Sequence, residues 1–163
     1  MAWIDPATWY AQLPACYLAT AMLLTDTEDR VLLVKTHYRD DWGLPGGVAE
    51  EGEPPHLACR REIGEELGLD RPAGPLLAVD FATADGHRLR SMIYLIFDGG
   101  TLTGAPAITV QEDEIAEYAV LPPDAAARMA PATAHRLPCA LTARRTGRVA
   151  YLPSGLTAYR TTS

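Results

Sequence analysis

The sequence predicts an α+β fold with a mixed β-sheet. Two observations carry this prediction. Apolar, partly β-branched runs occur in pairs separated by short polar turns, and segments with helical spacing follow each pair. Paired runs of this kind indicate adjacent strands, whereas apolar residues three or four positions apart indicate helices.

The first pair of strands is predicted at residues 16–25 and 31–36, because the polar segment 26–30 between them is typical of a turn. Residues 37–52 are rich in Asp, Pro and Gly, which favours a shaped loop over regular structure. Loops of this composition often carry binding or catalytic residues.

A helix is predicted within residues 53–67, where apolar side chains recur at helical spacing. Two prolines suit its first turn, and Gly68 suits its end. The apolar runs 76–83 and 89–97 then predict a second hairpin, central in the sheet and covered on both faces.

Four further elements are predicted in the last third of the chain. Residues 117–121 fit an edge strand, and residues 149–152 fit a short return to the sheet. Helices are predicted at 124–129 and 133–145, the second interrupted by Pro138.

Length and composition favour one domain over residues 1–163. The 48% of apolar and 21% of charged residues fit a globular core that buries about 70% of the unfolded surface. The net charge of −7 opposes the field that holds nucleic acid through its phosphates, which disfavours nucleic acid as a partner.

The compartment is predicted to be the cytoplasm. Three cysteines at widely spaced positions form no C-x-x-C pair, which favours a reducing environment. The most apolar run, residues 15–24, is too short to cross a bilayer, and no Lys or Arg precedes it, so we expect no membrane association.

The predicted helix 53–67 carries three carboxylates on one face. Glu62, Glu65 and Glu66 occupy positions i, i+3 and i+4, which lie close together at 3.6 residues per turn. Their mutual repulsion leaves two interpretations: a solvated acidic stripe, or a site where a cation neutralises them.

The surroundings of these glutamates match a longer pattern. It runs through residues 47–69 in the following order: Gly47, five residues, Glu53, seven residues, Arg61-Glu62-Ile63, one residue, Glu65-Glu66, one residue, Gly68-Leu69. This segment resembles the Nudix box at every position, and a chance match has odds on the order of 10⁻⁸. The preceding residues, 42–47, also resemble the family's entry to its loop.

The resemblance implies a Nudix-type α/β/α sandwich and a hydrolase. Such enzymes cleave a pyrophosphate bond in a nucleoside diphosphate linked to another moiety, using water and Mg²⁺ or Mn²⁺, ions that carboxylate oxygens suit. The expected partner is therefore a small nucleotide, either a nucleoside triphosphate or a nucleotide sugar. Two alternatives stay open, a nucleotide-sensing module that does not hydrolyse and an RNA 5′-pyrophosphohydrolase, and the resemblance also leaves a homodimer open.

The resemblance further implies roles for individual residues. Glu65 and Glu66 resemble the main metal ligands, and Glu62 resembles a ligand or the base that activates water. The carbonyl of Gly46 resembles a backbone ligand, and Glu114 resembles a further carboxylate that acts as ligand or base.

Residues outside the carboxylate group complete the expected site. Glu53 and Arg61 resemble a pair that ties the loop to the helix by a charged hydrogen bond. Lys35 and Arg39 are candidate substrate contacts because of their charge, and Gly47 because a residue without Cβ lets a phosphate approach the backbone.

Overall fold

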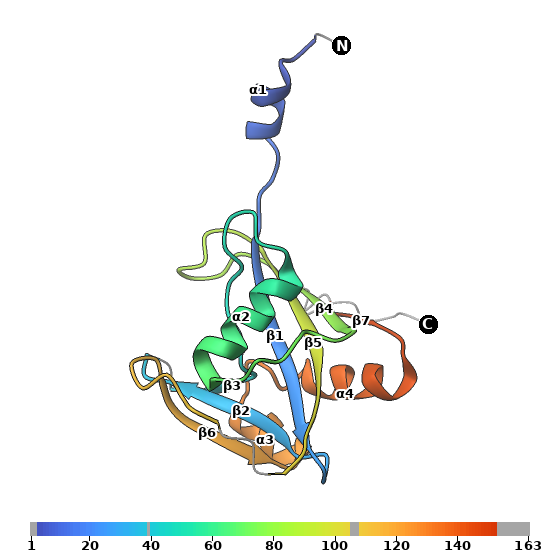
Figure 1. Cartoon of the computed structure of the whole chain (residues 1–163). Helices are drawn as coiled ribbons and strands as arrows, with labels where there is room; N and C mark the ends of the chain where they lie inside the picture. The colour runs from blue at the N-terminus through green and yellow to red at the C-terminus, as the bar shows by residue number, and fades with distance from the viewer. Residues whose placement is uncertain (1–2, 39, 105–107, 153–163) are drawn as a thin grey trace.

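A computed structural model describes residues 3–38, 40–104 and 108–152 of the chain. Figure 1 shows a sheet with helices packed against it. The elements follow in the order α1 (Pro6–Ala11), β1 (Tyr17–Asp26), β2 (Val31–Thr36), β3 (Trp42–Gly43), α2 (Pro55–Leu67), β4 (Leu76–Ala82), β5 (Met92–Leu102), β6 (Ile115–Leu121), α3 (Pro123–Met129), α4 (Leu137–Thr146) and β7 (Ala150–Leu152).

The sheet is mixed, as predicted. Its strand order is β3-β2-β1-β5-β4-β7, and β6 pairs with β2 outside this path. The pairs β1–β5 and β4–β7 are parallel, whereas the other pairs are antiparallel. β4 and β5 form the predicted second hairpin in the interior of the sheet.

Helices cover both faces of the sheet, which confirms the predicted α+β sandwich. Alternation along β1 sends Met22 to a core that includes Ile63 of α2, and sends Leu23 to a second core that includes Leu137 of α4. All four side chains are essentially inaccessible to water. Each buried aliphatic or Met side chain contributes about 1.5–3 kcal/mol, so these two cores fix α2 and α4 against opposite faces.

The first two strands pair less than the sequence predicts. β1 and β2 share only the register pair Thr25 and Val31 next to their turn, after which they diverge. β1 instead pairs with β5 from Tyr17 onward, and β2 pairs with β6, which begins at Ile115 before the predicted residues 117–121. β6 pairs with β2 and lies outside the main path of strands, so the predicted edge strand 117–121 is confirmed.

The start and end of β5 and the start of α4 differ from the sequence predictions by three residues or more. β5 begins at Met92 rather than at residue 89, since Leu89 is exposed in the turn region, and it extends to Leu102. α4 begins at Leu137, and Pro138 lies in its first turn instead of interrupting it. Proline suits that position because the first backbone N–H groups of a helix have no acceptor within the helix.

Helix α1 is absent from the sequence predictions. The Asp5 side chain accepts a hydrogen bond of 3.0 Å from the backbone N–H of Thr8, and Pro6 follows it at the first helical position. None of the residues of α1 is buried, and Figure 1 shows it standing away from the sheet. Its capping signal was present in the sequence, but no apolar periodicity accompanied it.

Two ion pairs connect the sheet to α4 and to the residue that precedes it. Arg136 donates from Nε to Asp80 at 2.6 Å, and the Asp80 side chain is fully buried. Arg144 donates to Asp98 at 2.7 Å. Among the described residues, no helix is both long and apolar enough to cross a membrane.

Candidate active site

Helix α2 begins and ends where its sequence predicts. Pro54 precedes its first turn, and Gly68 ends it in the left-handed conformation, with φ of 66°, donating its N–H to the carbonyl of Gly64. The face that includes Ile63 and Leu67 is buried against the sheet. Glu66 lies on the edge of that face and is only 3% exposed.

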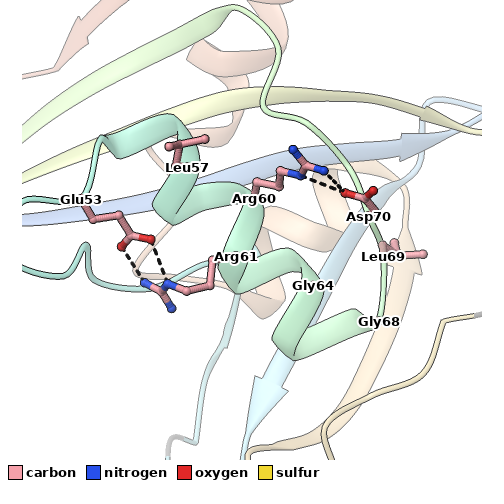
Figure 2. Close-up of a pocket in the computed structure, with 8 residues that line it drawn as sticks. All are labelled: Glu53, Leu57, Arg60, Arg61, Gly64, Gly68, Leu69 and Asp70. Atoms are coloured by element: carbon pink, nitrogen blue, oxygen red, sulfur yellow. Dashed lines mark hydrogen bonds and ion pairs between the residues drawn. The ribbon is translucent and has the colours of Figure 1, made fainter.

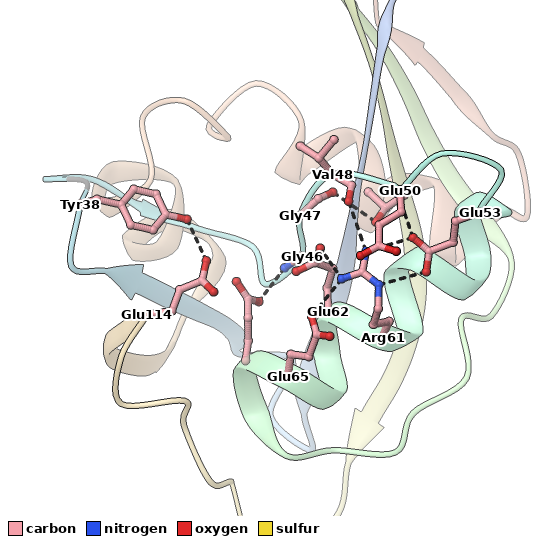
Figure 3. A network of polar contacts seen from close by, with 12 residues as sticks. Tyr38, Gly46, Gly47, Val48, Glu50, Glu53, Arg61, Glu62, Glu65 and Glu114 are labelled. Atoms are coloured by element: carbon pink, nitrogen blue, oxygen red, sulfur yellow. Dashed lines mark hydrogen bonds and ion pairs between the residues drawn. The ribbon is translucent and has the colours of Figure 1, made fainter.

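The loop before α2 runs along the start of β1. The backbone N–H of Thr20 donates to the carbonyl of Gly47 at 2.8 Å, and that of Met22 donates to Pro45 at 2.9 Å. These bonds hold the Pro-Gly-Gly segment against the strand. The loop therefore has a fixed position beneath the carboxylates of α2 (Figure 3).

A Cβ at either glycine of this loop would collide with a neighbouring group, the backbone of β1 at Gly46 and the end of the Glu62 side chain at Gly47. Gly46 has φ of 139°, and a Cβ there would lie 2.3 Å from the carbonyl oxygen of Thr20. A Cβ on Gly47 would lie 2.5 Å from the carboxyl carbon of Glu62. The N–H of Gly46 donates to Oε2 of Glu66 at 2.7 Å, so the loop and the helix contact each other directly.

Arg61 is the centre of the polar network in Figure 3. Its guanidinium donates to both oxygens of Glu53, each at 3.0 Å, which is the contact that the sequence predicts between loop and helix. The same group donates to Glu62 and to Glu65, each at 2.9 Å. Hydrogen bonding to Arg61 lowers the pKa of Glu53, and hydrogen bonding to Glu53 raises the pKa of Arg61.

The pKa values of Glu62 and Glu66 are raised, whereas that of Glu53 is lowered. Burial, together with the charges of Glu62, Glu114 and Glu65, raises the pKa of Glu66 to about 8, against a lowering by the Gly46 N–H. Burial also raises the pKa of Glu62, with a further raise from Glu65 and Glu114. The site thus concentrates negative charge in a poorly hydrated place, which is costly without a cation.

Glu114 approaches this group from a distant part of the chain. It lies in the turn before β6, and its side chain accepts a hydrogen bond of 3.0 Å from the Tyr38 hydroxyl (Figure 3). Its charge acts on both Glu62 and Glu66. Glu114 therefore lies within electrostatic reach of Glu62 and Glu66, while Glu65 lies at the rim with its side chain 51% exposed.

Of the two predicted cationic substrate contacts, Lys35 is not part of this group. Lys35 lies on β2, and strand alternation places it with Leu33, on the face opposite α2. Arg39 lies outside the described residues. Sequence reasoning missed the contact of Tyr38 with Glu114, since the two residues are 76 positions apart and nothing local links them.

The hollow drawn in Figure 2 lies beside α2, and Glu62, Glu66 and Glu114 are not among the residues that line it. It has a volume of about 520 Å³ and is bordered by the ion pair of Arg60 with Asp70, at 2.7 Å. Its walls consist of Glu53, Leu57, Arg60, Arg61, Gly64, Gly68, Leu69 and Asp70. The hollow therefore adjoins the carboxylate group through Glu53 and Arg61 without including Glu62, Glu66 or Glu114.

The chemistry of the carboxylate group suits a hard divalent cation. Its donors are carboxylate oxygens, the ligands that Mg²⁺ and Mn²⁺ prefer, and a bound cation would offset the charge that raises the pKa of Glu66. Within residues 3–38, 40–104 and 108–152, no three His, Cys, Asp or Glu side chains are already arranged to hold a metal ion. Arg61 instead neutralises part of the charge.

Comparison with known proteins decides the family. The NUDIX domain model matches residues 17–139, which span β1 to β6 of the sheet, the loop and α2. The chain belongs to the NUDIX domain family. The solved structure of a UDP-X diphosphatase has the same fold, with a TM-score of 0.68 at 20% identity, over 91% of this chain and 75% of that one.

Curated NUDIX relatives match part of the chain. Diphosphoinositol polyphosphate phosphohydrolase 2 of Rattus norvegicus is 38% identical over 73 residues, 44% of this chain and 40% of that protein. ADP-ribose pyrophosphatase of Mycobacterium tuberculosis is 32% identical over 102 residues, 60% of this chain and 49% of that protein. The matched segments thus span less than half the length of either relative.

Proposed function

We propose that this NUDIX protein hydrolyses a pyrophosphate bond in a small nucleotide, a nucleoside diphosphate linked to a phosphate or a sugar. Glu62, Glu65, Glu66, Glu114 and the carbonyl of Gly46 would hold Mg²⁺ or Mn²⁺. Such a cation, when bound, offsets the charge of the diphosphate and of the leaving group. The names of the curated relatives, a phosphohydrolase and a pyrophosphatase, support this class of reaction.

The chain's own groups would shape the reaction around that centre. Arg61 holds Glu62 in place at 2.9 Å, so that Glu62 can serve as a ligand or accept a proton from the attacking water. The bidentate contact of Arg61 with Glu53 fixes the loop relative to α2. The missing Cβ at Gly46 lets the loop lie against the backbone of β1, and the missing Cβ at Gly47 leaves room for the Glu62 carboxyl group rather than for a phosphate.

The observation that carries the proposal is the position of Glu66. Its carboxyl group is buried, lies 2.7 Å from the N–H of Gly46, and shares its surroundings with the charges of Glu62 and Glu114. A solvated acidic stripe would have its carboxylates in water, where such repulsion is screened. The geometry supports the cation-binding interpretation of the three-carboxylate face.

The proposal is tested with a panel of nucleoside triphosphates, nucleotide sugars, ADP-ribose and a 5′-triphosphorylated RNA. Each is incubated with the protein and Mg²⁺, Mn²⁺ or EDTA, and the products are separated by anion-exchange chromatography. We expect cleavage of at least one small nucleotide only when a divalent cation is present. Glu66→Gln should lower turnover about 100-fold or more, since a lost ligand commonly costs that much, while the exposed Glu117→Gln should keep it.

The other outcomes separate the alternatives. Binding of a nucleotide without cleavage in any metal would contradict hydrolysis and favour a sensing module. Cleavage of the triphosphorylated RNA alone would contradict a small-nucleotide substrate. Full activity of Glu66→Gln would show that the carboxylate face of α2 does not hold the cation.

A further inference from the structure

A tyrosine outside the Nudix box contacts the fourth carboxylate of the site. Tyr38 follows β2, and its hydroxyl donates to Oε1 of Glu114 at 3.0 Å (Figure 3). The Tyr38 side chain is 70% exposed, so its ring contributes little to the core. The position of this tyrosine is therefore better explained by its hydroxyl contact than by packing.

The backbones of the two segments are also joined. The N–H of His37 donates to the carbonyl of Glu114 at 2.9 Å, and Nε2 of the same His37 lies 3.0 Å from the carbonyl of Glu112. Just beyond them, Thr36 of β2 pairs with Ile115 of β6. The Cα of Glu114 is thereby fixed relative to the end of β2.

The same segment is fastened to α2 at its other end. The N–H of Gln111 donates to the carbonyl of Glu66 at 3.2 Å, and the N–H of Thr109 donates to the carbonyl of Leu67 at 3.0 Å. These carbonyls belong to the last turn of the helix, where no N–H of the helix itself donates to them. Residues 109–114 consequently bridge α2 and the end of β2, and Glu114 projects from this bridge.

These backbone contacts do not fix the side chain of Glu114. The neighbouring carboxylates of Glu62 and Glu66 repel it, and a glutamate has enough rotamers to turn toward water. A hydrogen bond from a neutral hydroxyl to one carboxylate oxygen opposes that turn and leaves Oε2 for another partner. An orienting contact of this kind is common behind metal-ligating carboxylates.

We propose that Tyr38 is a positioning residue that holds Glu114 as a ligand of the divalent cation. The inference rests on the proposed function, because it requires the cation site of α2. It gives the segment after β2, which lies outside the Nudix box, a part in the site. It also gives Glu114 the role of ligand, since the hydroxyl keeps its carboxylate within electrostatic reach of those of Glu62 and Glu66.

The test measures Mn²⁺ binding by electron paramagnetic resonance of the free ion, with no nucleotide present. Tyr38→Phe removes only the hydroxyl, and we expect it to weaken Mn²⁺ affinity about 3–10-fold, with Glu114→Gln weakening it about 10–100-fold. In the Glu114→Gln background, Tyr38→Phe should have no further effect. Tyr118→Phe is the matched control, because its side chain is exposed on β6, and it should bind Mn²⁺ as the wild type does.

Urea unfolding of each variant shows whether the fold is retained, and Tyr38→Phe should keep the wild-type midpoint. Wild-type Mn²⁺ affinity in Tyr38→Phe would overturn the inference and leave the proposed function intact. If Tyr38→Phe lowered Mn²⁺ affinity equally in the wild type and in the Glu114→Gln background, the inference would also be overturned. Tyr38 would then act on the cation site without Glu114. Failure of the wild type to bind Mn²⁺ would overturn the proposed function and the inference together.

Discussion

Glu66→Gln is predicted to change how the stability of the metal-free protein depends on pH. The glutamine keeps the size of the side chain and can still accept the hydrogen bond from Gly46, but it cannot ionise. In the wild type, burial and neighbouring charges raise the pKa of Glu66 from 4.5 to about 8. The folded protein therefore binds more protons than the unfolded chain between these two pH values, so its stability falls as the pH rises through that window.

The magnitude follows from the size of that change. A difference of one in pKa corresponds to about 1.4 kcal/mol, so the wild type should lose on the order of 3–5 kcal/mol from this group between pH 4.5 and pH 8.5. The full contribution is present below pH 4.5 and is gone above about pH 8. Glu66→Gln should lack this loss and should be the more stable protein at pH 8.5.

The assay is urea unfolding in EDTA at a series of pH values, followed by circular dichroism. Glu117→Gln serves as the control, because it removes one carboxylate from an exposed position on β6. Adding Mn²⁺ at pH 8 should restore stability to the wild type and not to Glu66→Gln, since only the ionised carboxylate binds the cation. Parallel pH profiles for the wild type and Glu66→Gln would refute the reasoning.

Two further predictions concern packing. Asp80→Asn removes the charge from a fully buried carboxylate that holds Arg136 at 2.6 Å; we expect a loss of about 3–5 kcal/mol in the free energy of unfolding, and a loss under 1 kcal/mol in urea titration would contradict this. Gly47→Ala places a Cβ 2.5 Å from the carboxyl carbon of Glu62, so it should lower Mn²⁺-dependent turnover about 10-fold or more. Gly43→Ala is its control, because no atom lies within 4 Å of that Cβ, and equal turnover in the two variants would count against the steric argument.

Local features of this protein could be predicted from its sequence. Glu62, Glu65 and Glu66 share one face of α2 because the spacing of a helix dictates it, and Gly68 ends that helix as its composition suggests. The contact between Glu53 and Arg61 also spans only a loop and two helical turns. In each case the relevant partners lie within one element or its neighbour.

Contacts between distant segments could not be predicted in this way. The parallel pairing of β1 with β5, rather than a long hairpin with β2, depends on the whole sheet and leaves no periodicity in either strand. The same holds for Tyr38 with Glu114, and for Asp80 with Arg136, which are 76 and 56 positions apart. The partner of a lone Tyr or Asp becomes visible only when the fold brings it near.

The divalent cation at the carboxylates of α2 is the central claim, and anomalous X-ray diffraction from a crystal grown with Mn²⁺ tests it most directly. We expect a manganese peak in contact with the carboxylates of Glu62 and Glu66, on the side of α2 that faces Glu114. A peak elsewhere on the protein, or none at Mn²⁺ concentrations that support turnover, would contradict it.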